Sequence, residues 1–178
     1  TFFDNVKVPK ENLVGELNKG WSVAKALLVH ERKLMSEIGS DSPREVIVPN
    51  AAAREYLDFE HGKIADSQLR SDLVDYDMNM HAIGLSHFRT FEEKIAGVRS
   101  AAPMVMKYVG TEAEVTKSEL LLAIMGSQGL GWEGDGFSKS EIDTLRLWAM
   151  SKIMTIAGGT SEIQLNVIAK NVLQLPQS

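Results

Sequence analysis

A glutamate stands inside an apolar stripe near the start of the chain. In the stretch WSVAKALLVHERKLMSEI, residues 21–38, Glu31 lies three or four positions from four apolar residues, Leu27, Leu28, Leu34 and Met35. An α-helix brings side chains at these spacings onto one face, so Glu31 would share its face with apolar neighbours only. Burial raises the pKa of a carboxyl, and such a carboxylate can abstract a proton near neutral pH. Glu31 is therefore a candidate general base; the alternative is a carboxylate at the edge of the stripe that reaches water.

Two consecutive glycines near the C-terminus form the second feature that could do chemistry. Gly158 and Gly159 are followed by Thr160 and Ser161, either of which can cap a helix, and Glu162 falls in its first turn. Glycines let another group approach the main chain closely, and a helix N-terminus behind them offers free N–H donors. This arrangement suits a phosphate or another anionic ligand. The alternative is an ordinary turn between two helices.

Both features need helices to position them, and helical spacing of apolar residues recurs along most of the chain. One long stripe consists of apolar residues and a histidine: Leu69, Leu73, Tyr76, Met80, Ile83, His87, Phe91 and Val98. The pattern predicts helices over residues 21–38, from 51 to near Gly62, from about 67, from about 103 to 125, over 139–156 and after 160. The glycine-rich stretch GSQGLGWEGDG, residues 126–136, is predicted as a loop.

Five or six helices with short connections predict an all-α fold, an antiparallel up-and-down bundle of the four-helix type with extra short helices. The β-prone residues Phe2–Val8 end at Pro9 and predict a short strand before the bundle. A lone strand needs a partner from another part of a longer protein. We therefore expect residues 1–15 to be a terminal strand and linker from a missing β-domain, and residues 16–178 to be a helical domain.

Composition argues against several classes of protein. A net charge of −5 and a pI near 5.4 argue against nucleic acid as a partner, because phosphate backbones require a basic face. The absence of cysteine excludes disulfides and thiolate metal sites, and the four histidines lack metal-ligand spacing. The sequence contains no apolar run long enough to span a bilayer, so neither a metal nor a membrane is expected.

Three stretches together resemble the acyl-CoA dehydrogenase family. They are FFDNVKVPKENLVGELNKGW at the start, MGSQGLG in the middle and IAGGTSEIQLNVIAKNVLQLP at the end, in the order and spacing of that family's last middle-domain strand and helical C-terminal domain. The resemblance implies α,β-dehydrogenation of an acyl-CoA thioester, in which a glutamate removes the α-proton and a hydride passes to FAD. It also implies that Gly159, Thr160 and Glu162 contact FAD, and that Gly126 and Ser127 approach the dinucleotide of a neighbouring subunit.

The resemblance also bears on the catalytic base. Many family members carry the glutamate directly before the closing Gly-Thr, and that position is Gly158 here. Other members, similar to the isovaleryl and long-chain dehydrogenases, carry it on the first helix directly before an arginine. Glu31 and Arg32 stand at those positions, so the resemblance implies that Glu31 is the base and that Arg32 orders the site. A base on this helix favours a branched, long or bulky acyl group.

Partners and location are likewise implied by the family. The resemblance implies an electron-transfer flavoprotein or similar acceptor, a homotetramer or heteromer formed through the helical domain, and a cytoplasmic or mitochondrial-matrix location. The alternative hypothesis is a non-catalytic partner subunit or helical oligomerisation domain of a heteromeric acyl-CoA dehydrogenase, which the glycine at position 158 would permit.

Overall fold

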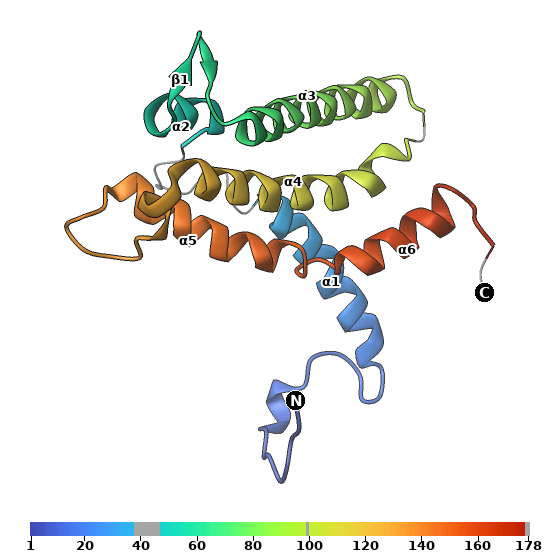
Figure 1. The fold of residues 1–178 in the computed structure, drawn as a ribbon. Helices are drawn as coiled ribbons and strands as arrows, with labels where there is room; N and C mark the ends of the chain where they lie inside the picture. Colours follow the sequence, from blue (N-terminus) through green and yellow to red (C-terminus); the bar gives the residue numbers. More distant parts are fainter. Residues whose placement is uncertain (38–46, 99, 177–178) are drawn as a thin grey trace. The chain divides into compact units, whose positions relative to one another are not determined.

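The computed structural model describes residues 1–37, 47–98 and 100–176, without the side chains of residues 29, 31–37, 103 and 104. The chain divides into two compact units, Thr1–Ser42 and Pro43–Ser178. Six α-helices make up most of the described residues, which confirms the predicted all-α class (Figure 1). The loop expected around residues 39–50 lies mostly outside the described residues.

The first unit contains a short 3-10 helix, η1 (Lys10–Asn12), and the helix α1 (Gly20–Glu37). Helix α1 matches the helix predicted from the apolar spacing of residues 21–38 within one residue at each end. The strand expected at residues 2–8 is not formed in the described structure. A strand needs neighbouring backbone groups to complete its hydrogen bonds, and no described segment of this chain pairs with these residues.

The second unit begins with α2 (Pro49–Tyr56), which has proline in its first turn. The sequence predicted that this helix continues to near Gly62, and that prediction is wrong. A hairpin follows instead, in which β1 (Phe59–Glu60) pairs antiparallel with β2 (Lys63–Ile64). His61 and Gly62 both have positive φ, 51° and 75°, as the two-residue turn of such a hairpin requires.

Two long antiparallel helices follow, α3 (Ser67–Ile95) and α4 (Ala102–Met125) (Figure 1). Asp66 caps α3, because its carboxylate accepts hydrogen bonds from the backbone N–H groups of Gln68 and Leu69 at 2.8 and 2.9 Å. A proline stands in the first turn of α4, and the helix ends at Met125, as predicted. The short connection between α3 and α4 therefore produces the up-and-down arrangement that the sequence indicated.

The last two helices are α5 (Lys139–Met154) and α6 (Ser161–Asn171). A 3-10 helix, η2 (Gly126–Leu130), joins α4 to the loop that precedes α5. Ser138 and Glu141 form a capping box at the start of α5, with each side chain bonded to the other residue's backbone N–H. Helix α4 is central in this unit: it packs against α2, α3, α5 and α6 (Figure 1).

The main core of the second unit lies where α2, β2, the start of α3 and the end of α4 meet. Its buried apolar residues are Ala52, Ala53, Ile64, Leu73, Leu120, Leu121 and Ile124. The two alanines let α2 approach α4 closely, and the Tyr56 hydroxyl donates a 3.0 Å hydrogen bond to Glu141 on α5. None of the helices in the described ranges is long and apolar enough to cross a membrane.

The stripe predicted on α3 is correct only in part. Its first five members, from Leu69 to Ile83, are buried or half-buried, whereas His87, Phe91 and Val98 are exposed. After Ile83 the half-buried positions are Ser86, Thr90 and Glu93, so packing falls one residue before the predicted His87 and Phe91. Two successive steps of four residues, from 83 to 87 and to 91, turn about 80° beyond two full turns of a helix, so the predicted stripe leaves the packed face.

Candidate functional site

The turn between α5 and α6 has a backbone that only glycine adopts without strain. Gly158 and Gly159 have φ values of 70° and 108°. The side-chain amide of Gln164 folds back over this turn and donates to the Gly158 carbonyl at 3.1 Å. A Cβ atom added to Gly159 would lie 2.6 Å from the amide nitrogen of Gln164. Gly158 is thus favoured by its positive φ, and Gly159 both by its φ and by the close approach of the Gln164 side chain.

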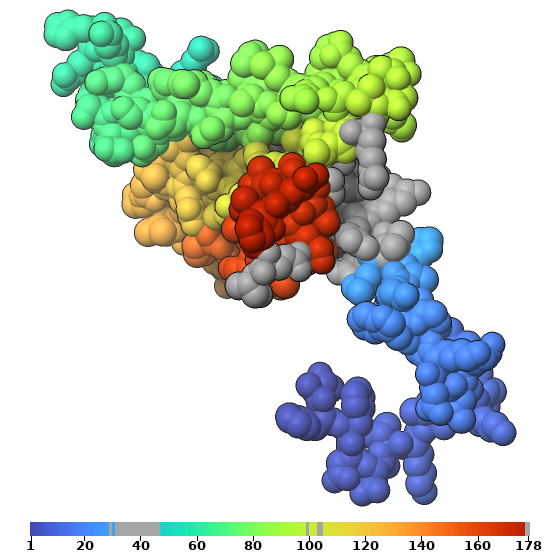
Figure 2. Space-filling view, turned by 90° about the vertical axis from the view of Figure 1, so that its right-hand side faces the viewer, coloured from blue at the N-terminus to red at the C-terminus, as the bar shows by residue number. Residues whose placement is uncertain are grey.

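Thr160 caps α6, one of the two possibilities that the sequence allowed. Its side-chain oxygen accepts a long hydrogen bond, 3.4 Å, from the backbone N–H of Ile163. The pKa of Glu162, in the first turn, is lowered because its carboxylate accepts from its own backbone N–H and from the Thr160 hydroxyl. Helix α6 lies at the surface of the second unit, where Figure 2 shows it in red. Residues 157–161 of the turn before it are half-buried, and Glu162 is exposed.

Two side chains of α4, not anticipated from the sequence, hold the same turn. The Lys107 ammonium donates to the carbonyl of Gly159 at 2.6 Å and to that of Met154 at 3.3 Å. The Ser161 hydroxyl donates to the Glu112 carboxylate at 2.5 Å. The available signal was a single lysine within the otherwise apolar run PMVMKYV, because a cation in such a run requires a polar partner.

The second glycine-rich segment is more ordered than the predicted loop. Gly126 ends α4 with a φ of 57°, and residues 126–130 form η2. Gly126 and Ser127 are exposed, whereas Gly129 is buried against Leu122. The structure does not bring these residues to the α5–α6 turn of the same chain. Met125 lies 18 positions after Lys107 on the same helix, a length of about 27 Å at 1.5 Å per residue.

The candidate base lies in the first unit. Glu31 and Arg32 belong to α1, but their side chains are outside the described part of the chain. Their contacts are therefore not part of the observed geometry, and their catalytic role stays a prediction. The described residues also contain no group of three or more acidic or histidine side chains placed to hold a metal ion.

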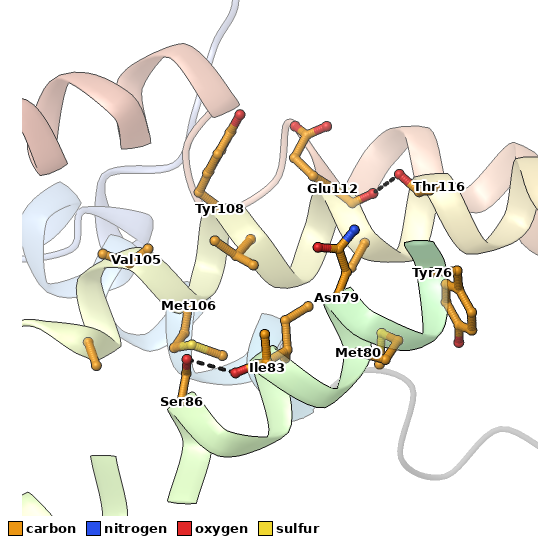
Figure 3. A pocket seen from close by; sticks show the side chains of 14 residues that line it. Tyr76, Asn79, Met80, Ile83, Ser86, Val105, Met106, Tyr108, Glu112 and Thr116 are labelled. Atoms are coloured by element: carbon orange, nitrogen blue, oxygen red, sulfur yellow. Dashed lines mark hydrogen bonds between the residues drawn. The ribbon is translucent and has the colours of Figure 1, made fainter. Parts of the chain in front are cut away.

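A groove of about 490 Å³ runs between α3 and α4 (Figure 3). Its walls are mainly apolar, with Met80 and Ile83 from α3 and Val105 and Met106 from α4. The carboxylate of Glu112, at its edge, points away from α3 in Figure 3 and bonds to Ser161 instead. The described groove therefore offers apolar contact and contains no arrangement of acid, base or nucleophile.

The outer face of α3 is also apolar. Five residues at spacings of three, four and seven are more than half exposed, namely Val74, Met78, Leu85, Phe88 and Ile95. A helix with apolar side chains on two faces has one face available for a further contact.

Comparison with known proteins places the chain in a family. The model of the acyl-CoA dehydrogenase C-terminal domain matches residues 18–173. The chain belongs to this family. The acyl-CoA dehydrogenase FadE26 of Mycobacterium tuberculosis is 25% identical over the whole chain, which covers 46% of that relative. The expected resemblance to the helical C-terminal domain of acyl-CoA dehydrogenases is thereby confirmed.

Solved structures share the fold of this acyl-CoA dehydrogenase chain. A Tcur3481–Tcur3483 steroid ACAD gives a TM-score of 0.65 at 23% identity, over 99% of this chain and 45% of the other. The ChsE4–ChsE5 complex from Mycobacterium tuberculosis gives a TM-score of 0.61 at 23% identity, over 99% and 45%. The chain thus spans less than half of the length of the relatives that it matches.

Proposed function

We propose that this chain is the helical C-terminal part of an FAD-dependent enzyme that introduces an α,β double bond into an acyl-CoA thioester. The match of the family model to residues 18–173 carries this proposal. In it, residues 16–178 form the helical domain, and residues 1–15 link that domain to a β-domain. The enzyme acts in the cytoplasm, or in the mitochondrial matrix if the source is eukaryotic.

The α5–α6 turn fits a flavin nucleotide by its chemistry. Gly159 allows close approach to the main chain, Thr160 caps α6, and the backbone N–H of Thr160 has no hydrogen-bond acceptor among the described residues. We assign Gly159, Thr160 and Glu162 to contacts with FAD, and Gly126 and Ser127 to contacts with the dinucleotide of a neighbouring subunit. Bound FAD would supply the acceptor for the hydride that leaves the β-carbon.

In this proposal Glu31 takes the proton from the α-carbon. Its apolar neighbours on α1 would raise the pKa of the carboxyl toward the range in which a general base works. Arg32 orders the site beside it. Gly158 stands where many family members have their glutamate, so no second carboxylate competes for this role at that position.

The substrate class follows from the position of the base. A base on α1 instead of the α5–α6 turn leaves room beside the turn, which favours a branched, long or bulky acyl group. A structural neighbour that is described as a steroid ACAD supports a bulky substrate. Electrons would leave through an electron-transfer flavoprotein or a similar acceptor, and the exposed apolar face of α3 supports assembly into a homotetramer or heteromer.

The test is Glu31→Gln in the full-length protein, with Glu16→Gln as the matched control. Glu16 lies in the same unit and pairs with Lys19 at 2.5 Å in an exposed position. Loss of a general base slows the reaction roughly 10²- to 10⁴-fold, so we expect Glu31→Gln to stop bleaching of the flavin by a bulky acyl-CoA. The control should bleach like the wild type. Unimpaired bleaching by Glu31→Gln would remove Glu31 from the mechanism.

A non-catalytic partner subunit is the second candidate function. Gly158 in place of the usual glutamate favours it, and so does the structural neighbour described as a complex of ChsE4 with ChsE5. In this role the fold serves assembly and flavin edge contacts while another chain supplies the base. Purification of the full-length protein alone decides: bound FAD with turnover excludes the partner role, and loss of both supports it.

A further inference from the structure

Lys107 occupies an unusual place for a cation. Its neighbours Val105, Met106, Tyr108 and Val109 are apolar or aromatic, and its helix α4 packs against α5 and α6. Burial lowers the pKa of the ammonium, and the nearby Glu112 carboxylate opposes that effect. Such a lysine persists in a packed helix when its hydrogen-bond donors are used.

The Lys107 donors are used on the end of α5 and on the turn after it. The carbonyl of Met154 belongs to the last turn of α5, where carbonyls lack intrahelical N–H partners and carry partial negative charge. The carbonyl of Gly159 lies in the glycine turn and receives the shorter bond, at 2.6 Å. One ammonium therefore bonds both to the end of α5 and to the residue before the cap of α6. Lys107 and Gly159 are 52 positions apart in the sequence.

This bond fixes the direction of a backbone donor. The peptide between Gly159 and Thr160 is planar and trans, so its N–H points opposite to its carbonyl. With the Gly159 carbonyl held by Lys107, the Thr160 N–H is directed away from α4. Within the described parts of the chain this N–H has no hydrogen-bond acceptor. It is thus a donor on the side of the turn away from α4, without a partner in the described part of the chain.

Two further bonds hold the turn on either side. Gln164 holds the Gly158 carbonyl from within α6, and Glu112 holds the Ser161 hydroxyl from α4. Lys107 and Glu112 lie five residues apart on α4 and contact the turn before and after the cap, Thr160. Without Lys107 the Gly159 peptide could rotate, because glycine at φ 108° has a wide choice of conformations.

We propose that Lys107 is a positioning residue for the flavin site: by holding the Gly159 carbonyl, it aims the Thr160 N–H at the bound nucleotide. The proposal rests on the proposed FAD contact of this turn. Lys107 itself touches neither flavin nor substrate. It acts through the backbone, so an arginine, which keeps the charge and the N–H donors, should replace it better than an apolar side chain of equal length.

The test compares Lys107→Met, Lys107→Arg and the control Lys117→Met in the full-length protein. Lys117 lies on the same helix and pairs with Glu114 at 3.3 Å, away from the turn. FAD affinity is measured by flavin fluorescence, and amide hydrogen exchange is followed across residues 155–164. Because loss of an aligned charge-assisted bond changes affinity by about tenfold, we expect Lys107→Met to weaken FAD binding roughly tenfold. Exchange in the turn should accelerate, while the control and Lys107→Arg stay near wild type.

The outcomes separate this inference from the proposed function. We call the bond from Lys107 to the Gly159 carbonyl the clamp. If Lys107→Met speeds exchange in the turn alone and the wild type binds no FAD, the clamp is upheld and the flavin site is refuted. Normal FAD affinity and normal exchange in Lys107→Met overturn the clamp. Faster exchange throughout the domain also overturns it, because that reports general destabilisation. If Lys107→Met does not fold, Ser161→Ala removes the bond to Glu112 and should give the same local pattern more weakly; an unchanged turn contradicts the clamp.

Discussion

Replacement of Gly131 by alanine tests how tightly the glycine loop is packed. Gly131 follows η2, is buried, and has ordinary extended angles, φ −76° and ψ 119°. Alanine therefore adds no backbone strain at this position. The ideal Cβ position nevertheless overlaps the ring of Phe137. The loop has little freedom to yield, because the next carbonyl, that of Trp132, accepts from Arg146 on α5 at 3.1 Å.

Gly136 provides the matched control in the same loop. A Cβ atom there meets nothing within 4 Å. Both substitutions reduce the freedom of the unfolded chain by the same amount, worth about 0.4–1 kcal/mol in favour of the folded state. Overpacking a filled site costs about 1–3 kcal/mol, so the free energy of unfolding of Gly131→Ala should fall below that of Gly136→Ala by about this amount. Each kcal/mol corresponds to roughly 2–4 °C in Tm for a domain of this size.

The assay is thermal unfolding of the full-length variants, with amide hydrogen exchange over residues 126–138 as the local readout. Phe137→Ala supplies the internal check, because removal of the ring leaves room for the added methyl group. In that background Gly131→Ala should cost no more than Gly136→Ala. Equal Tm values for the two glycine variants in the native background would refute the steric reasoning, and so would a cost that persists without the ring.

Two further predictions concern the core of the second unit. The pKa of the Glu141 carboxyl is lowered from 4.5, chiefly because the Ser138 backbone N–H donates to it. The contribution of this carboxylate to the stability of the fold is therefore complete above pH 4.5 and is lost as the pH falls through the lowered pKa. Tm between about pH 3 and pH 7 should thus fall less steeply toward acid in Glu141→Gln than in the wild type, and an unchanged slope would contradict this. Ile124→Ala should lower the free energy of unfolding by about 2–5 kcal/mol, because the Ile124 residue is only 2% exposed. Ile153→Ala, at a position that is 52% exposed, should lower it far less. Equal losses in the two variants would contradict the assignment of Ile124 to the core.

Local signals predicted most of the helical architecture. The start of α3 near residue 67, where Asp66 or Ser67 could cap it, and the end of α4 at Met125 follow from residue types whose effect is confined to one turn. The hairpin at residues 59–64 was missed because apolar spacing continues from α2 into it. The turn His61–Gly62 determines the outcome, since positive φ at both residues closes two short strands and ends the helical path.

The sequence predicted the backbone of the candidate site but not the side chains that hold it. Gly159 and Thr160 were singled out from the order of adjacent residue types, and the structure has a glycine turn and a helix cap at these residues. Lys107 and Glu112 reach that turn across 52 and 49 positions of sequence. Such contacts depend on how α4 packs against α5 and α6, and a single sequence contains no periodic signal for them.

Helix α4 fixes the distance between the α5–α6 turn and the segment Gly126–Ser127, and this distance decides whether one chain can bring both to one ligand. Its first half holds the α5–α6 turn through Lys107, and its last residue leads directly into Gly126 and Ser127. A continuous α-helix is stiff, so the two segments stay about 27 Å apart along α4. In one chain, Gly126 and Ser127 on one side and the α5–α6 turn on the other are therefore two separate segments. The proposed contacts of both segments with FAD therefore require two copies of the chain, each contributing one segment to a given nucleotide.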